Sequence, residues 1–562
     1  MVRYLRFIGV IWLLHCACAG TLITNLPYTI SSPGDYILGH SMATTSGVAI
    51  SINASNVTLD LNSNSLIGDN TDPFTAFGIV ASNSTNIVVK NGTIDGFRVS
   101  GLVLNGVTKA SIKNLVIQNI NNTGIWTGLF ATNIVSGFLA SSSYDLSLSH
   151  VSIENITLQD SNNIVLSEAG GVIADSCANM TNEHVLINGV SNNCGIGEGF
   201  GILDCSGTTI LKSTVTNIAT GEGATNNFIG HTCLGMVFSP SRLSCYILGA
   251  TVINGGSGYL GTPEVTISAV SNDDGTTGGG YATVSPSGQV TSIVITNIGW
   301  NYETFPQVTI TGTGTGATAT VLPNQVGYAT IGYCGNIRVE DCDIGNITGG
   351  IDDAHGISLF TVTDAVIKRV HVNGVTDGLN SLGIGGSKAT GFENYGDPSA
   401  VDCNITLEDC SAKNITAIGP ADLAANGFSA AGNGISFIRC NASNVKVSGI
   451  NRLDPPASPG TGIGFGWAPD VRIQNIYPAN NSLIQSCTAS DCQVGFDTFN
   501  FQNSTWNADK TKSDGIDYLQ EPFGTVRTIY GSLWNEVVDA LSYPNGIKAI
   551  SIYNSVGGNS IR

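Results

Sequence analysis

The chain has 562 residues, of which 42% are hydrophobic and only 11% are charged, and it contains 70 glycines. Val, Ile, Thr, Ser, Asn and Gly dominate, a composition typical of short strands joined by tight turns, and this excludes a helix-rich fold. The formal net charge of −19 makes nucleic acid a poor partner, because binding it needs clustered Lys and Arg. An acidic polysaccharide would be repelled unless a cation bridged it, whereas a neutral glycan, a cation or a protein would not.

Residues 1–19 are expected to be a secretory signal. Two arginines precede the apolar run Phe7–Leu14, which is too short to span a bilayer, and the small residues Ala17–Ala19 suit a cleavage site. Lipidation of Cys18 is the alternative, although a histidine stands where a lipobox has an aliphatic residue. No later stretch is long and apolar enough to cross a membrane. The mature protein is therefore expected to be secreted or surface-exposed.

The chain after the signal repeats itself. Asn86–Ile94 matches Lys109–Ile117 at an offset of 23, and Asn336–Thr348 matches Asn404–Thr416 at an offset of 68, which we interpret as about three coils. Three short strands per coil, each with period-two alternation, would place a row of aliphatic side chains inside and pair the backbone with the coils on either side. One coil cannot bury its apolar row alone, so only the stack is stable. The pattern predicts an all-β solenoid, a parallel β-helix.

Three columns of repeat residues support this reading. A glycine followed by an aliphatic residue recurs at Gly78, Gly101, Gly201, Gly356, Gly434 and Gly462. One turn position holds residues that tolerate the left-handed conformation, namely Asn91, Asn114, Asp341 and Asp409. One further position holds Cys342, Cys410, Cys440 and Cys487. These cysteines are expected to stack as buried thiols, although some could pair in an oxidising compartment.

A duplicated unit interrupts the coils. Val252–Ile267 and Ile295–Ile310 align at an offset of 43, with further strands expected over Gly278–Val284 and Gln289–Ile293. After about residue 503 the composition changes, and Gly531–Leu541 has helical spacing, which predicts a C-terminal cap. The expected organisation is a signal (1–19), an N-terminal cap and coils (20–249), a small β insertion (250–325), further coils (326–502) and a C-terminal cap (503–562).

The coils resemble the right-handed β-helix shared by the pectate-lyase-like superfamily. The opening residues Ile23–Leu38 and Ile50–Gly68 are similar to the start of secreted β-helix proteins from environmental bacteria and large amoeba-infecting DNA viruses. The GGSGY-x3-P-x-V-T-I unit is similar to repeats in phage-tail, virion and surface proteins. The resemblance implies a right-handed coil, exposure on a cell or virion surface, and a homotrimer as in β-helix tailspikes. The superfamily includes lyases, hydrolases, adhesins and inert rods, so fold alone leaves the activity open.

Asp352, Asp353 and His355 are the candidate catalytic residues, as acid–base or cation-binding groups. They resemble the DD and GHG elements of polygalacturonases, but here the acids and the histidine share one strand, and the basic motif is IKR instead of RIK. Lys368 and Arg369, one coil later, are candidate ligand-binding residues or a lyase base, since proton abstraction next to a carboxyl group needs a basic side chain. A solvated turn is the alternative interpretation of this pair.

Two further candidate sites depend on register and on aromatic content. Glu198, Asp204 and Asp353 could line one edge of the helix and bind Ca²⁺, or form a hydrated turn. The aromatic residues of the insertion could form a sugar-stacking platform, or equally the core of that unit. They are Tyr259, Trp300 and Tyr302, with Tyr281 and Phe305 beside them.

The predicted function is that of a non-catalytic structural or adhesive component that binds a polysaccharide, a cell-surface glycan or a cell surface. The alternative is a carbohydrate-active enzyme, a polysaccharide lyase or glycoside hydrolase, that acts along the flat face of the helix. Thirteen Asn-x-Ser/Thr sequons would accept glycans in a eukaryotic secretory route, or they are turn residues required by the repeat.

Overall fold

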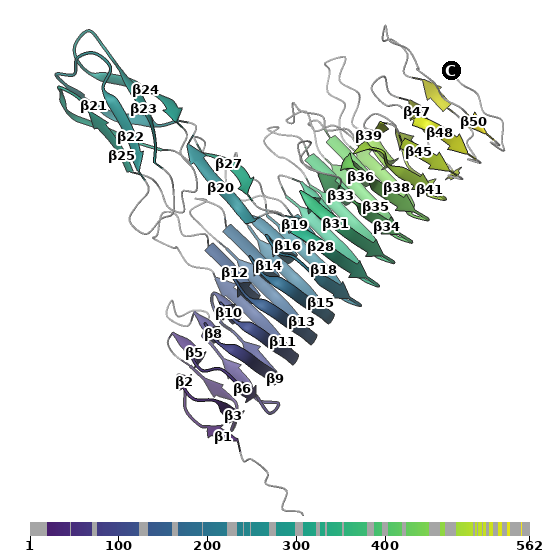
Figure 1. Ribbon diagram of the computed structural model, residues 1–562, viewed down its shortest axis with the longest axis horizontal. Helices are drawn as coiled ribbons and strands as arrows, with labels where there is room; N and C mark the ends of the chain where they lie inside the picture. Colours follow the sequence, from purple (N-terminus) through teal and green to yellow (C-terminus); the bar gives the residue numbers. More distant parts are fainter. Residues whose placement is uncertain are drawn as a thin grey trace, which may run out of the picture.

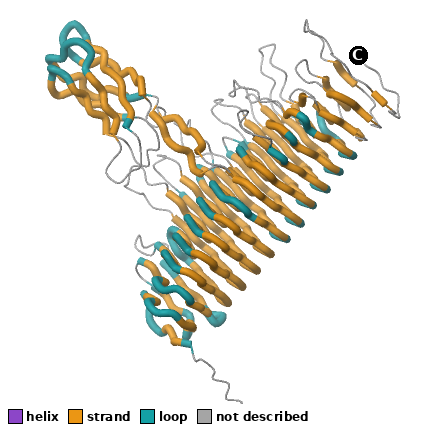
Figure 2. Tube along the Cα trace, viewed as in Figure 1, coloured by secondary structure: helices purple, strands orange, loops and turns teal. Residues whose placement is uncertain are grey.

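The computed structural model describes residues 20–44, 47–69, 76–122, 133–159, 167–193, 195–221, 233–239, 241–247, 249–268, 277–297, 307–321, 326–331, 334–350, 353–378, 387–395, 403–418, 423–448, 461–466, 479–497 and short strands between 501 and 553. These residues form a right-handed parallel β-helix, seen as a row of stacked arrows in Figure 1 and as a strand-coloured tube in Figure 2. No helix occurs among them, so the predicted all-β solenoid is confirmed.

One strand of each coil belongs to a sheet that we call sheet 1. Its strands are β2 (Tyr28–Ile30), β5 (Val48–Ile52), β8 (Phe77–Ser82), β10 (Ser100–Asn105), β12 (Asn133–Ser141), β14 (Ser167–Asp175), β16 (Ile196–Leu203), β19 (Cys233–Ser239), β30 (Ala354–Phe360), β33 (Ser387–Tyr395), β36 (Leu423–Asn433), β39 (Thr461–Phe465), β43 (Val494–Asp497), β47 (Ile516–Gln520) and β49 (Val537–Asp539), with β40 (Ala479–Asn480) and β44 (Phe501–Gln502) beside the end of β36.

The rest of each coil forms sheet 2, which has 25 strands in the described residues. Its strands are β1 (Thr21–Ile23), β3 (Gly34–Leu38), β4 (Met42–Ala43), β6 (Val57–Asp60), β7 (Ser65–Ile67), β9 (Thr85–Asp95), β11 (Thr108–Asn122), β13 (Tyr144–Leu158), β15 (Ala178–Asn192), β17 (Thr209–Leu211), β18 (Thr214–Thr220), β28 (Cys334–Glu340), β29 (Asp343–Gly349), β31 (Val362–Lys368), β32 (His371–Asp377), β34 (Ile405–Glu408), β35 (Ser411–Ile418), β37 (Ile435–Ile438), β38 (Asn441–Ser448), β41 (Leu483–Gln485), β42 (Thr488–Ser490), β45 (Ser504–Asn507), β46 (Lys510–Lys512), β48 (Val526–Tyr530) and β50 (Ile552–Tyr553).

Sheet 2 bends where asparagine or a residue that replaces it takes the left-handed conformation. In β11 these bends are at Asn114 and Asn119, whose φ angles are 54° and 56°. The predicted turn column is confirmed, since Asn91, Asp341 and Asp409 also have positive φ. Asn and Asp adopt this conformation at low cost because their short polar side chains bond locally.

The coil register confirms one predicted offset and corrects the other. Ile87 of β9 lies opposite Ala110 of β11, which is the predicted offset of 23. Ile337 lies opposite Ala365, which lies opposite Ile405, so the offset of 68 spans two coils of 28 and 40 residues, not three. The three-coil interpretation was wrong because coil length varies with the segment that returns the chain to sheet 1.

The interior is apolar and tightly stacked. Phe392, Phe428, Phe465 and Phe496 stack along sheet 1 with ring centroids 4.8, 4.8 and 5.1 Å apart. Ten cysteines of the described residues are buried thiols, among them all four of the predicted column. This confirms the expected stacking of small side chains at one repeat position.

A column of glycines in sheet 1 lets neighbouring coils and the opposite wall approach closely. A Cβ at Gly171, for example, would lie 2.5 Å from Cγ2 of Ile187 and 2.8 Å from the carbonyl oxygen of Gly199. The column contains Gly78, Gly101, Gly137, Gly171, Gly199, Gly235, Gly356, Gly391, Gly427 and Gly464. The predicted glycine marker therefore combined glycines from different positions of the coil, because Gly201, Gly434 and Gly462 lie outside this column.

The duplicated unit projects from the rod, at the upper left of Figure 1. The antiparallel pair β20 (Ser241–Ile247) and β27 (Val326–Ile331) connects it to the coils. Beyond this pair lie β21 (Thr251–Ser257) with β26 (Thr315–Thr320), and a four-stranded antiparallel sheet with the order β24-β23-β22-β25. Its strands are β22 (Glu264–Ser268), β23 (Gly278–Val284), β24 (Val290–Asn297) and β25 (Gln307–Thr311). We call residues 250–321 the projecting module.

The tail differs from the predicted helix. Val537–Asp539 is strand β49, which pairs in parallel with β47, and β45 to β48 extend the coil sheets. The helical prediction for Gly531–Leu541 was wrong over these residues, because pairing with the preceding coil overrides a short helical periodicity. Within the described residues no helix has the length and apolar character needed to span a bilayer.

Candidate functional site

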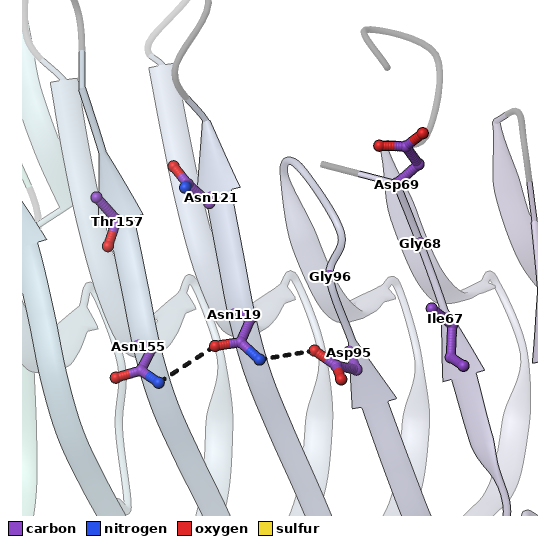
Figure 3. Close-up of a pocket in the computed structure, with 9 residues that line it drawn as sticks. All are labelled: Ile67, Gly68, Asp69, Asp95, Gly96, Asn119, Asn121, Asn155 and Thr157. Atoms are coloured by element: carbon purple, nitrogen blue, oxygen red, sulfur yellow. Dashed lines mark hydrogen bonds between the residues drawn. The ribbon is translucent and has the colours of Figure 1, made fainter. Parts of the chain in front are cut away.

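A polar groove runs across four successive coils near the N-terminal end of sheet 2 (Figure 3). Its volume is about 650 Å³. The lining consists of carboxylates, carboxamides, one hydroxyl, two glycines and one aliphatic side chain, namely Ile67, Gly68, Asp69, Asp95, Gly96, Asn119, Asn121, Asn155 and Thr157. We call this surface the N-terminal groove.

Two stacked glycines give the groove a floor of bare backbone. The N–H of Gly68 donates to the carbonyl of Asp95 at 2.8 Å, and the N–H of Gly96 donates to that of Gln118 at 3.1 Å. A Cβ at Gly68 would lie 2.6 Å from the carbonyl oxygen of Gly96 and 2.8 Å from the ring of Phe97. A larger residue would therefore displace the floor as well as fill the groove.

Side-chain amides form a ladder along the groove edge, as the dashed lines in Figure 3 show. Nδ2 of Asn119 donates to Oδ1 of Asp95 at 2.8 Å, and Nδ2 of Asn155 donates to Oδ1 of Asn119 at 3.2 Å. Because stacked coils are about 4.8 Å apart, this ladder repeats polar groups at a fixed spacing along the helix axis. Asn121 of β11 and Thr157 of β13 lie opposite each other on adjacent strands, two residues after Asn119 and Asn155.

The groove contains neutral hydrogen-bonding groups and two carboxylates. None of its lining residues is Lys, Arg or His. Such a surface can donate from amides and accept at carbonyl, carboxylate and hydroxyl oxygens, which suits a ligand that carries hydroxyl groups. An anionic ligand would meet repulsion here.

A second set of polar side chains lies on the outer face of sheet 1, where β30 and β33 are neighbours. Oε1 of Glu393 pairs with Nζ of Lys388, and Oε2 lies 3.1 Å from Nδ1 of His355. The second contact is at ion-pair distance but lacks hydrogen-bond geometry. The side chains of His355, Lys388 and Glu393 are only 4%, 5% and 10% exposed. We call these three residues the buried charged cluster.

Burial decides the charge state of this cluster. Burial lowers the pKa of His355 to about 4, with Glu393 acting against this shift and Lys388 adding to it. Burial alone would raise the pKa of Glu393, but the attraction of His355 and Lys388 and the hydrogen bond from Lys388 lower it. At neutral pH the imidazole is therefore neutral, and the ammonium of Lys388 is the charge that holds the carboxylate ionised.

The other predicted catalytic residues are placed only in part. Asp353 directly precedes β30, and its carbonyl accepts a hydrogen bond from the N–H of Cys233 at 3.0 Å. Asp352 lies outside the described residues. The structure thus places the predicted His355 beside Glu393 and Lys388, two charged groups that the sequence analysis did not connect with it.

The three predicted calcium ligands are not brought together. Glu198 is 2% exposed, and its Oε1 lies only 2.0 Å from the position that a Cβ at Gly201 would occupy. Asp204 follows the end of β16, whereas Asp353 precedes the start of β30, so the two are roughly 25 Å apart along parallel strands. No group of three His, Cys, Asp or Glu side chains in the described part of the chain is arranged as metal ligands.

Lys368 and Arg369 belong to an alternating row of charges on sheet 2. Nζ of Lys368 lies 2.6 Å from Oε2 of Glu408. Arg369 binds Asp341 through Nε at 2.5 Å and through a terminal nitrogen at 3.0 Å, which raises the pKa of Arg369 and lowers that of Asp341. The side-chain charges in the turn column that includes Arg369 alternate between positive and negative. The residues of this column are, in order, Lys212, Asp341, Arg369, Asp409 and Arg439.

Lys368 also lines a shallow hollow of about 550 Å³ on the same face. Its lining is of mixed charge, namely Asn336, Ile337, Arg338, Glu340, Asp364, Val366, Lys368 and Asn404. Arg338 is held by Glu340 at 2.9 Å, so both cations of the hollow have a carboxylate partner.

The aromatic residues of the predicted platform do not share one environment in the structure. Tyr259 is 3% exposed and belongs to the core of the projecting module, where its hydroxyl accepts a hydrogen bond from the N–H of Ala317 at 3.3 Å. Its ring is therefore not available on the module surface. Trp300 and Tyr302 lie outside the described residues. Tyr281 is 39% exposed.

Sequence reasoning missed the N-terminal groove. Its residues give no signal of their own, because Asn, Asp and Gly at a repeat turn need no ligand to explain them. The signal that could have revealed the groove is the succession of polar residues at one side of consecutive coils. Recognising that these residues are neighbours requires the register between coils, and the coils differ in length.

No protein-family model matches the sequence, and no curated protein matches it either. Among solved structures the chain is similar to the tailspike protein of E. coli bacteriophage HK620 in complex with a pentasaccharide, at 10% identity over 97% of this chain and 74% of that chain, with a TM-score of 0.37. A mutant of that tailspike gives a TM-score of 0.39 over the same shares. A candidate glycosyl hydrolase from Parabacteroides merdae is similar at 12% identity over 35% of this chain and 85% of that chain, with a TM-score of 0.21.

Proposed function

We propose that this chain is a surface-exposed or secreted β-helix that binds a neutral glycan in its N-terminal groove without cleaving it. The observation that carries the proposal is the groove itself, a hollow of about 650 Å³ lined by Asp, Asn, Thr and Gly of successive coils. A sugar presents hydroxyl groups at intervals, and the groove presents amide and carboxylate groups at intervals set by the coil spacing.

Rigidity supports this proposal. The groove residues are held by backbone bonds between coils and by the amide ladder through Asp95, Asn119 and Asn155. A preformed site loses little entropy when a flexible glycan binds, so the ordering cost falls mainly on the ligand.

Charge defines the class of glycan. The protein has a net charge of −19, and the groove has two carboxylates and no cationic side chain. Neutral polysaccharides and those that carry amino groups are compatible with this surface, whereas uronic acid polymers are repelled.

The test is binding of the full chain, made in a bacterial host, to an array of neutral, amino and acidic glycans. We expect a neutral or amino glycan to be retained, and the double substitution Asn121→Ala with Thr157→Ala to weaken its binding at least tenfold. Ser147→Ala, which removes a hydroxyl from the same strand β13 outside the groove, is the matched control and should bind normally. Unchanged binding by the groove variant, or a preference for acidic glycans, would contradict the proposal.

A carbohydrate-active enzyme is the second candidate, and the buried charged cluster favours it. An imidazole, a carboxylate and an ammonium group within ion-pair distance are groups able to transfer protons. The discriminating assay measures new reducing ends and unsaturated products on the same glycans. Cleavage that is lost in His355→Ala and in Glu393→Gln would support the enzyme, and absence of product would leave binding as the function.

The location and assembly proposed for the chain follow from the sequence analysis. Export by the segment 1–19, display on a cell or virion surface, and a homotrimer remain proposals. Light scattering on the purified chain gives the mass directly, and a monomer at micromolar concentration would overturn the trimer.

A further inference from the structure

Exposed apolar side chains are concentrated on the projecting module. Nine large hydrophobic side chains are exposed in the described part of the chain, and four of them lie in this unit of about 70 residues. They are Ile253 (69%), Leu260 (74%), Tyr281 (39%) and Val294 (37%). They are carried by a unit that stands away from the rod, where exposed apolar side chains that adjoin one another mark a contact surface.

Two of these residues are neighbours on one face of the four-stranded sheet. Tyr281 of β23 lies opposite Val294 of β24 on one side and Glu264 of β22 on the other. Thr311 of β25 continues the row beyond Glu264. The row crosses all four strands, and adjacent strands are about 4.8 Å apart. An aromatic ring thus lies near the middle of the sheet, with an aliphatic side chain on one side and a carboxylate on the other.

Hydroxyl groups surround this row on the same face. Oγ1 of Thr283 is within hydrogen-bond distance of Thr291 and Ser292, at 2.8 and 2.7 Å. Thr266 and Thr309 face each other across β22 and β25. The face therefore offers many groups that both donate and accept hydrogen bonds.

The two described tyrosines of the module have different surroundings. Tyr259 is buried and hydrogen-bonded in the core, whereas Tyr281 makes no ring contact and no side-chain hydrogen bond within the described part of the chain. Packing in the core of the module therefore does not account for an aromatic residue at position 281. A Thr would suit the exposed face of a strand equally well.

Charge restricts what this face can contact. Residues 250–321 contain no Lys, Arg or His, and their charged residues are Glu264, Asp273, Asp274 and Glu303. Polyanions such as nucleic acids and acidic polysaccharides are therefore poor partners. A sugar ring offers an apolar face for the Tyr281 ring and hydroxyl groups for the surrounding Thr, Ser and Glu side chains.

We propose that the face of the projecting module centred on Tyr281, Val294 and Glu264 is a second binding surface for a neutral glycan, separate from the N-terminal groove. A pyranose ring stacks on Tyr281, and Glu264 accepts a hydrogen bond from one of its hydroxyl groups. Only the class of ligand rests on the proposed function, since the residues of the two surfaces do not overlap. Linking two such surfaces on one rigid chain raises the overall affinity for an extended polymer or a glycan-coated surface.

The experiment measures retention of the full chain on insoluble cellulose, chitin and mannan. We expect retention on at least one of these polymers, at least a tenfold loss in Tyr281→Ala, and near-normal retention in Tyr281→Phe, which keeps the ring. Thr309→Ala, on the same face but away from the ring, is the matched control. Because Tyr281 is exposed, the melting temperature of Tyr281→Ala should equal that of the unsubstituted chain.

The groove variant Asn121→Ala with Thr157→Ala separates this inference from the proposed function. It should keep the retention that depends on Tyr281, because its substitutions leave the module unchanged. Equal retention of Tyr281→Ala and the unsubstituted chain, or no retention on any of the three polymers, would overturn the inference. So would a lower oligomeric mass of Tyr281→Ala in light scattering, since the face would then be a contact between copies.

Discussion

His355 is held neutral in a nearly dry site beside the carboxylate of Glu393, whose other oxygen pairs with Lys388, and this makes the fold sensitive to acid. Burial lowers the pKa of His355 from an ordinary value of 6.5 to about 4. Between these two pH values the unfolded chain binds a proton that the folded chain does not bind. Stability therefore falls as the pH falls through this window, by up to about 3 kcal/mol. The lowered pKa of Glu393 acts in the same direction, because its stabilising charge is lost in acid.

The corresponding prediction concerns His355→Gln. This substitution should lower the urea midpoint at pH 7.5 and should make the midpoint fall less steeply between pH 6.5 and pH 4 than in the unsubstituted chain. His371→Gln is the control, because His371 is exposed. Parallel slopes in all three proteins would show that His355 does not carry the effect.

The sequence identified His355 as a residue to examine but not its partners. Lys388 and Glu393 lie one coil further along, at a distance of 33 and 38 residues in the chain. That coil is 35 residues long, from Ile357 to Phe392, whereas the repeat visible in the sequence is 23. Contacts between side chains of neighbouring coils depend on this length, which local patterns do not encode.

At the scale of the strand, the glycine column of sheet 1 sets how closely the walls approach. Gly171→Ala should destabilise the fold by about 2 kcal/mol or more, because its Cβ would overlap Ile187 and the backbone of Gly199. Gly345→Ala is the matched control within a strand, since its Cβ would meet nothing closer than 3.2 Å. Urea unfolding measures both. Equal midpoints for the two variants would contradict the role of the column.

The stacked cysteines give a second prediction at this scale. Burial raises the pKa of Cys233 to about 12 and that of Cys334 and Cys342 to about 11, so the reactive thiolate is scarce. Mass spectrometry after iodoacetamide treatment should find the ten cysteines that the structure shows as buried unlabelled in the native protein and labelled in urea. Labelling of any of them under native conditions, or a disulfide between two of them, would contradict the packing described here.

Elements were predictable where the repeat is strong and local. The strands around Asn86–Ile94 and the strand Gly278–Val284 follow from alternation and turn residues, and the structure contains both. The helix expected within Gly531–Leu541 did not form over Val537–Asp539, because pairing with the preceding coil outweighs a short periodicity. The N-terminal groove was not predictable, since it depends on the stacking of residues such as Gly96 and Asn119 that also form ordinary turns.

At the scale of the whole molecule, the chain has a net charge of −19, and the two surfaces proposed to bind a glycan carry carboxylates and no cationic side chain. Binding of a neutral glycan by such a rod should be insensitive to salt, because no ion pairs form with the ligand. Calorimetry between 50 and 500 mM NaCl, conditions that differ about threefold in Debye length, should give a constant Kd. A steep loss of affinity with salt would indicate an anionic ligand and would contradict the charge argument.

Hydrogen–deuterium exchange of the full chain, with and without the best glycan from the array, shows whether the glycan binds in the N-terminal groove. We expect new protection at residues 67–69, 95–96, 119–121 and 155–157, four segments separated in the sequence that meet in this groove. Protection confined to other coils, or to the outer face of sheet 1 around His355, would contradict glycan binding in this groove.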